Sequence, residues 1–249
     1  MDASPFRSTT LFWYNPPPMA RHPRIAPGGL VYHVLNRSVG RVALFRKDSD
    51  FESFSRLVAE ALERHPIRIL SYCILPTHWH FVAWPHRDGQ LTEFFRWLTH
   101  THAMRWRAAH GTVGYGPLYQ GRFKSFPIQR DEHLLTVCRY VERNPVAIAL
   151  VQRAELWQCS SLWARMHKED AALSPWPVEV PPDWLEQVNT PLPQKDLDRM
   201  TISIQRSRPF GSDPWLHQTI SKLGLEHTIR PKGRPKGAAT QIISTGPTQ

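Results

Sequence analysis

Between residues 28 and 145, the apolar residues follow strand and helix spacings in an order that few folds accommodate. Alternation with a period of two favours strands, and recurrence every three to four residues favours helices. The predicted strands are Leu30–Arg37, Ile67–Leu75, His78–Trp84 and Arg122–Ile128. Three helices are predicted. The first is capped by Asp48 or Ser49 and its apolar positions run to Leu62, the second is Thr92–His110, and the third is Asp131–Asn144.

The resulting order is strand, helix, strand, strand, helix, strand, helix. Its first six elements match the split β-α-β arrangement, so we expect an α+β protein with a ferredoxin-like antiparallel sheet and helices on one face. After residue 165 the patterns weaken, and we expect a mostly helical or irregular C-terminal region. This fold supports many functions, so the function has to be argued from a site.

The composition narrows the classes of partner. A net charge of +10 and a pI of about 9.9 favour a polyanion, either nucleic acid or an anionic membrane surface. No apolar run reaches the length of a membrane span and no signal segment opens the chain, so we expect a cytoplasmic protein. Cys73, Cys138 and Cys159 lack paired spacing, and we interpret them as reduced core residues. The signature of zinc deaminases is absent.

Two histidines on one predicted strand form the first candidate site. Because side chains alternate along a strand, His78 and His80 project to one face while Trp79 projects to the other. Two neighbouring imidazoles are half of a divalent-metal site. The alternative is a pair of half-buried histidines that hydrogen bonds satisfy. His100 and His102 have the same spacing, but they lie in a predicted helix, where residues two apart point in different directions.

The predicted helix from Asp131 to Asn144 carries the second candidate. Tyr140 and Asn144 are four residues apart and therefore neighbours on one helix face. An amide oxygen is a suitable ligand for a hard cation, and a tyrosine one turn away would lie next to that cation. The alternatives are a packing role for Tyr140 and a helix-ending role for Asn144 before Pro145.

Three stretches together resemble a known family. They are Leu75–His80, the run Tyr119–Phe123, and the run Tyr140–Val146. In this order and spacing they are similar to the REP-associated tyrosine transposases, which belong to the HUH superfamily of single-strand DNA nucleases. The resemblance spans about residues 20–165. Glu142 and Arg143 depart from it, because relatives often have apolar or uncharged residues there.

The resemblance implies a metal-dependent single-strand DNA endonuclease and strand transferase. His78, His80 and Asn144 would bind one Mg²⁺ or Mn²⁺ ion, and Tyr140 would attack a phosphodiester and become linked to the 5′ phosphate. A tyrosine with a pKa of about 10 is a poor nucleophile, which a cation can offset by polarising the phosphoryl group. The implied substrate is hairpin DNA such as REP palindromes, bound by a monomer or homodimer. Two alternatives remain: a hairpin-binding regulator that does not cleave, and a metal-dependent hydrolase without a covalent step.

Basic and aromatic residues around these motifs are candidate DNA contacts. Arg37, Arg122 and Lys124 suit phosphate binding, or form a solvated basic face. Tyr119 suits stacking on a base, or packs within its loop. The C-terminal residues Arg230, Lys232, Arg234 and Lys236 resemble a minor-groove hook, or bind phosphates without specificity.

We expect five parts along the chain. They are a flexible extension at 1–18, a HUH tyrosine transposase catalytic domain at 19–165, a Pro- and Trp-rich linker at 166–195, a small helical and possible DNA-binding region at 196–229, and a basic disordered tail at 230–249. Met19 is an alternative to Met1 as the expected start of translation. A DNA-binding protein of this kind would associate with the nucleoid.

Overall fold

The computed structural model describes residues 24–169 and 171–230, so the expected extension at 1–18 and the tail beyond Arg230 lie outside the described residues. The core elements are β1 (Val31–Arg37), α1 (Asp48–Arg64), β2 (Arg68–Leu75), β3 (His78–Trp84), α2 (Gln90–Ala109), β4 (Lys124–Ile128) and α3 (Glu132–Ala147). The later helices are α4 (Ser161–Met166), α5 (Trp184–Asn189), α6 (Gln194–Arg206) and α7 (Asp213–Leu223). Short 3-10 turns η1, η2 and η3 span Val39–Arg41, Ala154–Leu156 and Glu226–Thr228. The order of core elements is the predicted one.

The four strands form one antiparallel sheet in the order β2-β3-β1-β4. This is the ferredoxin-like arrangement, and the fold prediction is confirmed. β1 and β3 are the two central strands, so the predicted metal-site strand is held on both sides by backbone hydrogen bonds. In the β1–β3 register, Arg37 lies opposite His78 and Leu35 lies opposite His80.

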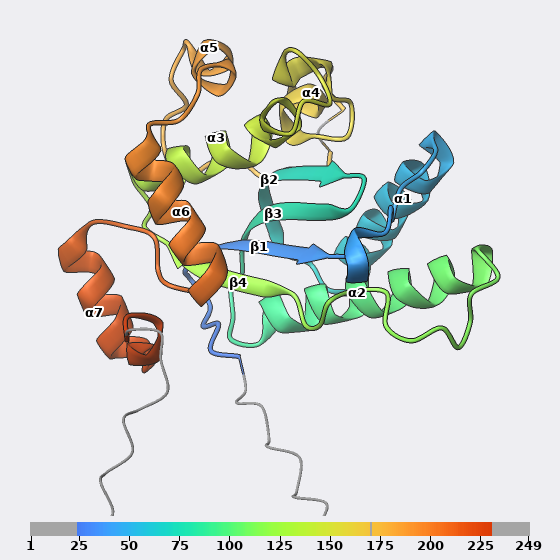
Figure 1. Ribbon diagram of the computed structural model, residues 1–249. Coiled ribbons are helices and arrows are strands. Elements are labelled where there is room, and N and C mark those ends of the chain that lie inside the picture. The colour runs from blue at the N-terminus through green and yellow to red at the C-terminus, as the bar shows by residue number, and fades with distance from the viewer. Residues whose placement is uncertain (1–23, 170, 231–249) are drawn as a thin grey trace, which may run out of the picture.

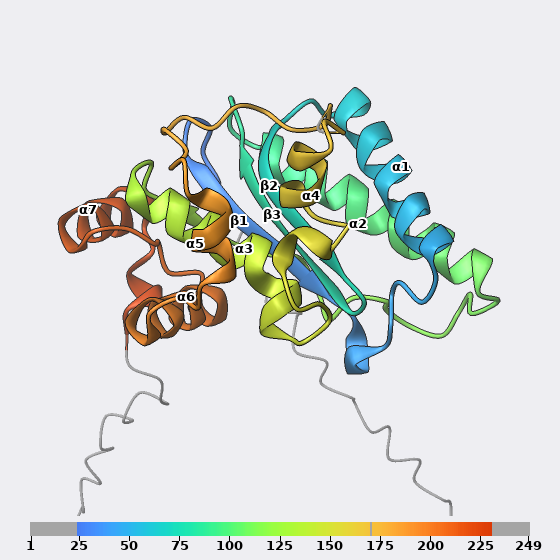
Figure 2. The ribbon, with the colours of Figure 1, turned by 90° about the horizontal axis from the view of Figure 1, so that it is seen from above.

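The two faces of the sheet are covered by different helices, as Figures 1 and 2 show. Tyr32, Trp79 and Phe81 pack in one apolar cluster with α1 and α2. Val31 and Val82 belong to the other cluster, with α3 and parts of the C-terminal region. The two connecting helices therefore share one face, as expected, and α3 covers the opposite face. His78 and His80 point toward α3, because Trp79 between them points toward α2.

The C-terminal region packs onto the core domain. The stretch expected to be a linker contains α5, and Trp184 at its start is buried against α3. Met200 on α6 is fully buried in the same apolar cluster. α3 also extends beyond its predicted end at Asn144 to Ala147, with Pro145 inside its last turn. Among the described residues, no helix is long and apolar enough to cross a membrane.

The outer edge of β2 is paired with other parts of the chain. The N–H of Ile74 donates to the carbonyl of Cys159 at 2.9 Å. The carbonyl of Leu70 accepts from Trp176 Nε1 at 2.6 Å. The segment that follows α3 therefore satisfies backbone groups that an edge strand would otherwise expose.

The outer edge of β4 is short and partly covered. This strand has five residues, and Pro127 within it has no N–H to offer. Phe210, after α6, donates its N–H to the carbonyl of Pro127 at 2.9 Å and forms a parallel bridge with Ile128.

Candidate active site

A cleft of about 460 Å³ lies between the sheet, the loop before β4, α3 and α6. Its walls include His78 and His80 from β3 and Tyr140 from α3, so strand and helix bring the predicted residues to one cavity. The same cleft is lined by Arg37, Arg122, Lys124 and, on α6, Thr201, Ile204 and Gln205.

Both histidines are oriented by a hydrogen bond at Nδ1. His78 Nδ1 lies 3.0 Å from Thr77 Oγ1, and His80 Nδ1 lies 2.9 Å from Nε2 of His33. Within the part of the chain that the structure describes, Nε2 of each ring has no hydrogen bond. An imidazole held at Nδ1 with Nε2 open is the usual state of a metal-ligating histidine.

The electrostatic surroundings keep these rings neutral. Burial, with a smaller contribution from Arg37, lowers the pKa of His78 to about 4. Burial and the neighbouring His33 and His78 rings hold the pKa of His80 well below its ordinary value. A neutral imidazole has the lone pair that a cation needs, so both residues suit a divalent ion at neutral pH.

Tyr140 packs edge-on against the histidines. Its ring centroid lies 5.9 Å from that of His80 and 6.3 Å from that of His33, with interplanar angles of 83° and 82°. Burial raises the pKa of the Tyr140 phenol, and a hydrogen bond from the Asn144 side chain opposes this rise. The phenol is therefore protonated at neutral pH and needs assistance to act as a nucleophile.

Asn144 lies one helical turn after Tyr140 and is 6% exposed. Its Nδ2 donates to the backbone carbonyl of Tyr140 at 3.4 Å, and Asn144 is not among the residues that line the cleft. The chemistry of the residues present thus fits a divalent cation at His78 and His80, whose rings are 5.1 Å apart between centroids and line the same cleft. Asn144 offers an amide oxygen of the right chemistry, but its side chain is held at the Tyr140 carbonyl and does not line the cleft.

A different cluster of possible ligands lies at the start of α3. Asp131, Glu132 and His133 place their ligand atoms within 4.8 Å of one another, the one such group of His, Cys, Asp and Glu found in the described ranges. Asp131 is the N-cap, and its Oδ1 already accepts from the backbone N–H of His133 at 2.9 Å. The cluster is accounted for as a helix cap.

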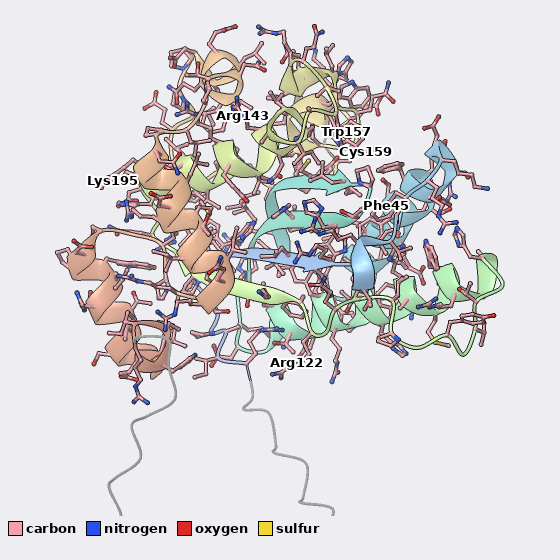
Figure 3. The ribbon with its side chains drawn as sticks, viewed as in Figure 1. Phe45, Arg122, Arg143, Trp157, Cys159 and Lys195 are labelled. Carbon is pink, nitrogen blue, oxygen red and sulfur yellow. The ribbon has the colours of Figure 1, made fainter. Side chains whose placement is uncertain are left out.

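The predicted phosphate contacts gather at the cleft. Arg37 and Lys124 are exposed on its walls, and Arg122, labelled in Figure 3, lies just before β4. A shallower hollow of about 320 Å³ adjoins the cleft, and Arg122 and Lys124 line both. Arg230 is exposed far along the chain, whereas Lys232, Arg234 and Lys236 lie outside the described residues.

Tyr119 cannot stack on a DNA base in this structure, which corrects that prediction. Its side chain is 5% exposed and lies beneath the sheet on the side of α2. Trp79 Nε1 donates to its hydroxyl at 3.0 Å, and the hydroxyl lies 2.6 Å from His102 Nδ1. The packing alternative holds for Tyr119, and His102 is a structural residue. Tyr115 in the same loop is 78% exposed.

Two buried polar residues next to the site were not predicted to have a role there. His33 on β1 is fully buried and contacts His80, and Glu142 on α3 is fully buried two residues after Tyr140. The sequence could have indicated them, because each residue occupies a buried position of its element. On β1, for example, His33 alternates with the core residues Tyr32 and Val34 and lies on the opposite face of the sheet.

Comparisons with known proteins identify one matching family and several similar structures. Residues 28–144 match the family model described as "Transposase IS200 like". No curated protein matches the chain. Among solved structures, the chain is similar to a REP-associated tyrosine transposase bound to a REP hairpin, with 18% identity over 70% of this chain and 95% of the other and a TM-score of 0.46. It is also similar to a putative transposase from Deinococcus radiodurans, with 16% identity over 49% of this chain and 95% of the other and a TM-score of 0.36.

The matched segment begins in the turn before β1 and ends at Asn144, the last residue of the predicted site. It includes His78, His80, Tyr140 and Asn144. The resemblance seen in the motifs is thus confirmed at the level of the transposase family. Residues 28–144 of this protein are therefore similar to the IS200-like transposases.

Proposed function

We propose that the protein cleaves and rejoins single-stranded DNA, with Tyr140 as nucleophile and His78 and His80 as ligands of one Mg²⁺ or Mn²⁺ ion. The observation that carries the proposal is the shared cleft. It places two neutral imidazoles with open Nε2 atoms beside the ring of a tyrosine. Asn144 is proposed as a third ligand through Oδ1, which requires its side chain to turn from its contact with the Tyr140 carbonyl.

In the proposed step, the phenolic oxygen of Tyr140 attacks the phosphorus of a phosphodiester. The bond from phosphorus to the 3′ oxygen breaks, the 5′ phosphate becomes linked to Tyr140, and the proton of the phenol leaves with the departing 3′ hydroxyl. A divalent ion, when bound, would polarise the phosphoryl oxygen and offset the developing charge. The reverse attack by another 3′ hydroxyl rejoins the strand, because the phosphotyrosine bond conserves the energy of the original bond.

The substrate is proposed to be a DNA hairpin such as a REP palindrome. The class of substrate rests on the motif resemblance, and the charge of the cleft supports it. Arg37, Arg122 and Lys124 surround the cleft with positive charge, which suits a phosphate backbone. A protein with such a substrate would be found with the nucleoid.

The test uses single-stranded hairpin DNA labelled at either end, incubated with Mg²⁺, Mn²⁺ or a chelator. We expect a protein–DNA adduct on the fragment that carries the 5′ phosphate. Tyr140→Phe should abolish it, as should the chelator. Tyr115→Phe is the matched control, because that tyrosine is exposed in a loop and should leave the adduct unchanged.

Two results would contradict the proposal. Cleavage that persists in Tyr140→Phe without an adduct would indicate a metal-dependent hydrolase. Tight hairpin binding without adduct or cleavage would indicate a non-cleaving regulator.

A further inference from the structure

A third histidine adjoins the candidate site from the neighbouring strand. His33 lies on β1, where it is opposite Val82, so it is a diagonal neighbour of His80 on the same face of the sheet. The two rings stack with centroids 5.0 Å apart, and His33 Nε2 lies 2.9 Å from His80 Nδ1. Phe126 on β4 packs against the other side of His33 at 4.9 Å. The His33 ring is therefore fixed between two neighbours.

The hydrogen bond between the two rings restricts where their protons lie. Each neutral imidazole carries one N–H, so when both rings are neutral one ring donates in this hydrogen bond and the other accepts. When His80 presents a lone pair at Nε2, its proton is on Nδ1 and is donated to Nε2 of His33. In the opposite arrangement His33 donates from Nε2, the proton of His80 is on Nε2, and that atom cannot bind a cation.

We infer that His33 is a positioning residue that holds His80 with the Nε2 lone pair directed into the cleft. The inference rests on the proposed cation site and adds a residue to it. His33 accepts the Nδ1 proton of His80, which fixes both the tautomer and the rotation of that ring. Outer hydrogen-bond partners of metal-ligating histidines typically change metal affinity by roughly 10- to 100-fold.

The other nitrogen of His33 sets a cost on this arrangement. When His33 accepts at Nε2 its proton is on Nδ1, and Nδ1 of His33 is buried without a hydrogen-bond partner among the described residues. Buried polar atoms in protein cores are normally paired, so this N–H is unfavourable by itself. A cation bound at Nε2 of His80 would offset the cost, because it selects the tautomer in which His80 donates to His33.

The test measures Mn²⁺ binding to the full chain without DNA, by the paramagnetic resonance signal of free Mn²⁺. In His33→Phe, which keeps the ring and removes the acceptor, we expect affinity to fall roughly 10- to 100-fold. His33→Gln can accept the same proton through Oε1 and should recover part of the loss. His102→Phe is the matched control, since it alters a buried histidine on the opposite face and should bind Mn²⁺ as the wild type does.

Imidazole ¹⁵N chemical shifts with Mg²⁺ supply a readout of the tautomer. In the wild type, we expect His80 to be protonated at Nδ1, and in His33→Phe to show a mixture of both tautomers. Unchanged Mn²⁺ affinity in His33→Phe would overturn the inference while leaving the cation site intact. An equal loss of affinity in His102→Phe would also overturn it, because general destabilisation would then explain both. Failure of the wild type to bind Mn²⁺ would refute the proposed site itself.

Discussion

Replacing Glu142 should destabilise the helix that carries Tyr140. The carboxylate is fully buried on α3 and joins this helix to three other elements. Its Oε2 accepts from Trp184 Nε1 at 2.9 Å on α5. Its Oε1 accepts from Ser161 Oγ at 2.6 Å on α4 and from Ser71 Oγ at 3.2 Å on β2, and lies 3.4 Å from Arg165.

The loss in the free energy of unfolding depends on which hydrogen-bond donors lose their acceptor. In Glu142→Gln, one oxygen still serves the serines, but the amide N–H₂ faces the N–H of Trp184. One buried donor is left unsatisfied, which costs about 1–3 kcal/mol. Both variants remove the charge partner of Arg165, and Glu142→Ala in addition leaves Ser161 and Ser71 without their acceptor; breaking a buried ion pair costs about 3–5 kcal/mol. Arg165 is 29% exposed and keeps its hydrogen bond to the Leu70 carbonyl, so we expect a value near the lower end, about 3 kcal/mol.

Urea unfolding followed by tryptophan fluorescence would measure these changes. Glu52→Gln is the surface control, since its side chain is 65% exposed and its loss should cost less than about 0.5 kcal/mol. In the double variant Glu142→Gln with Trp184→Phe, the clashing N–H is gone. The combined loss should therefore be smaller than the sum by about 1 kcal/mol. Strict additivity of the two changes would refute the hydrogen-bonding argument.

Three further predictions concern DNA contact and pH. For hairpin binding, the slope of log K against log salt concentration should become shallower by about one in Lys124→Ala and in Arg37→Ala. This is the change expected when one phosphate contact is lost. Deleting residues 231–249 should also lower this slope without changing the urea midpoint, because the deletion spares α6 and α7; an unchanged slope would mean that the tail does not contact phosphate. Burial lowers the pKa of His102 to about 3, so between its unfolded pKa of about 6.5 and that value only the unfolded chain takes up the proton. The free energy of unfolding should therefore decrease as the pH is lowered through this window, by up to about 1.4 kcal/mol per pH unit. In His102→Phe, this free energy should decrease less between pH 7 and pH 5.

Local sequence patterns predicted those parts of the site that depend on one element. His78 and His80 share a face because a strand alternates, and Tyr140 and Asn144 are neighbours because a helix repeats. Both relations are fixed by spacing alone, and both are present in the structure. The end of α3 was predicted three residues too early. Pro145 removes a single hydrogen bond in the last turn, which the helix tolerates to Ala147.

The missed features depend on contacts between elements. His33 contacts His80 only because the register of β1 against β3 places them diagonally. Tyr119 is buried because Trp79 and His102, from a strand and a helix, both hydrogen-bond to its hydroxyl. Spacing along the chain contains no information on such pairings, since register is set by the packing of the whole sheet.

The covered edges of the sheet have a consequence for how copies of this protein meet. A strand from another chain extends a sheet when it hydrogen-bonds to unpaired backbone groups at the sheet edge, and fibrils grow by repeating that step. Here Cys159 and Trp176 already pair with β2, while Phe210 and Pro127 limit what β4 can offer. Where many copies of the protein are crowded together, contacts between them should therefore be made by side chains, and the copies should separate again on dilution.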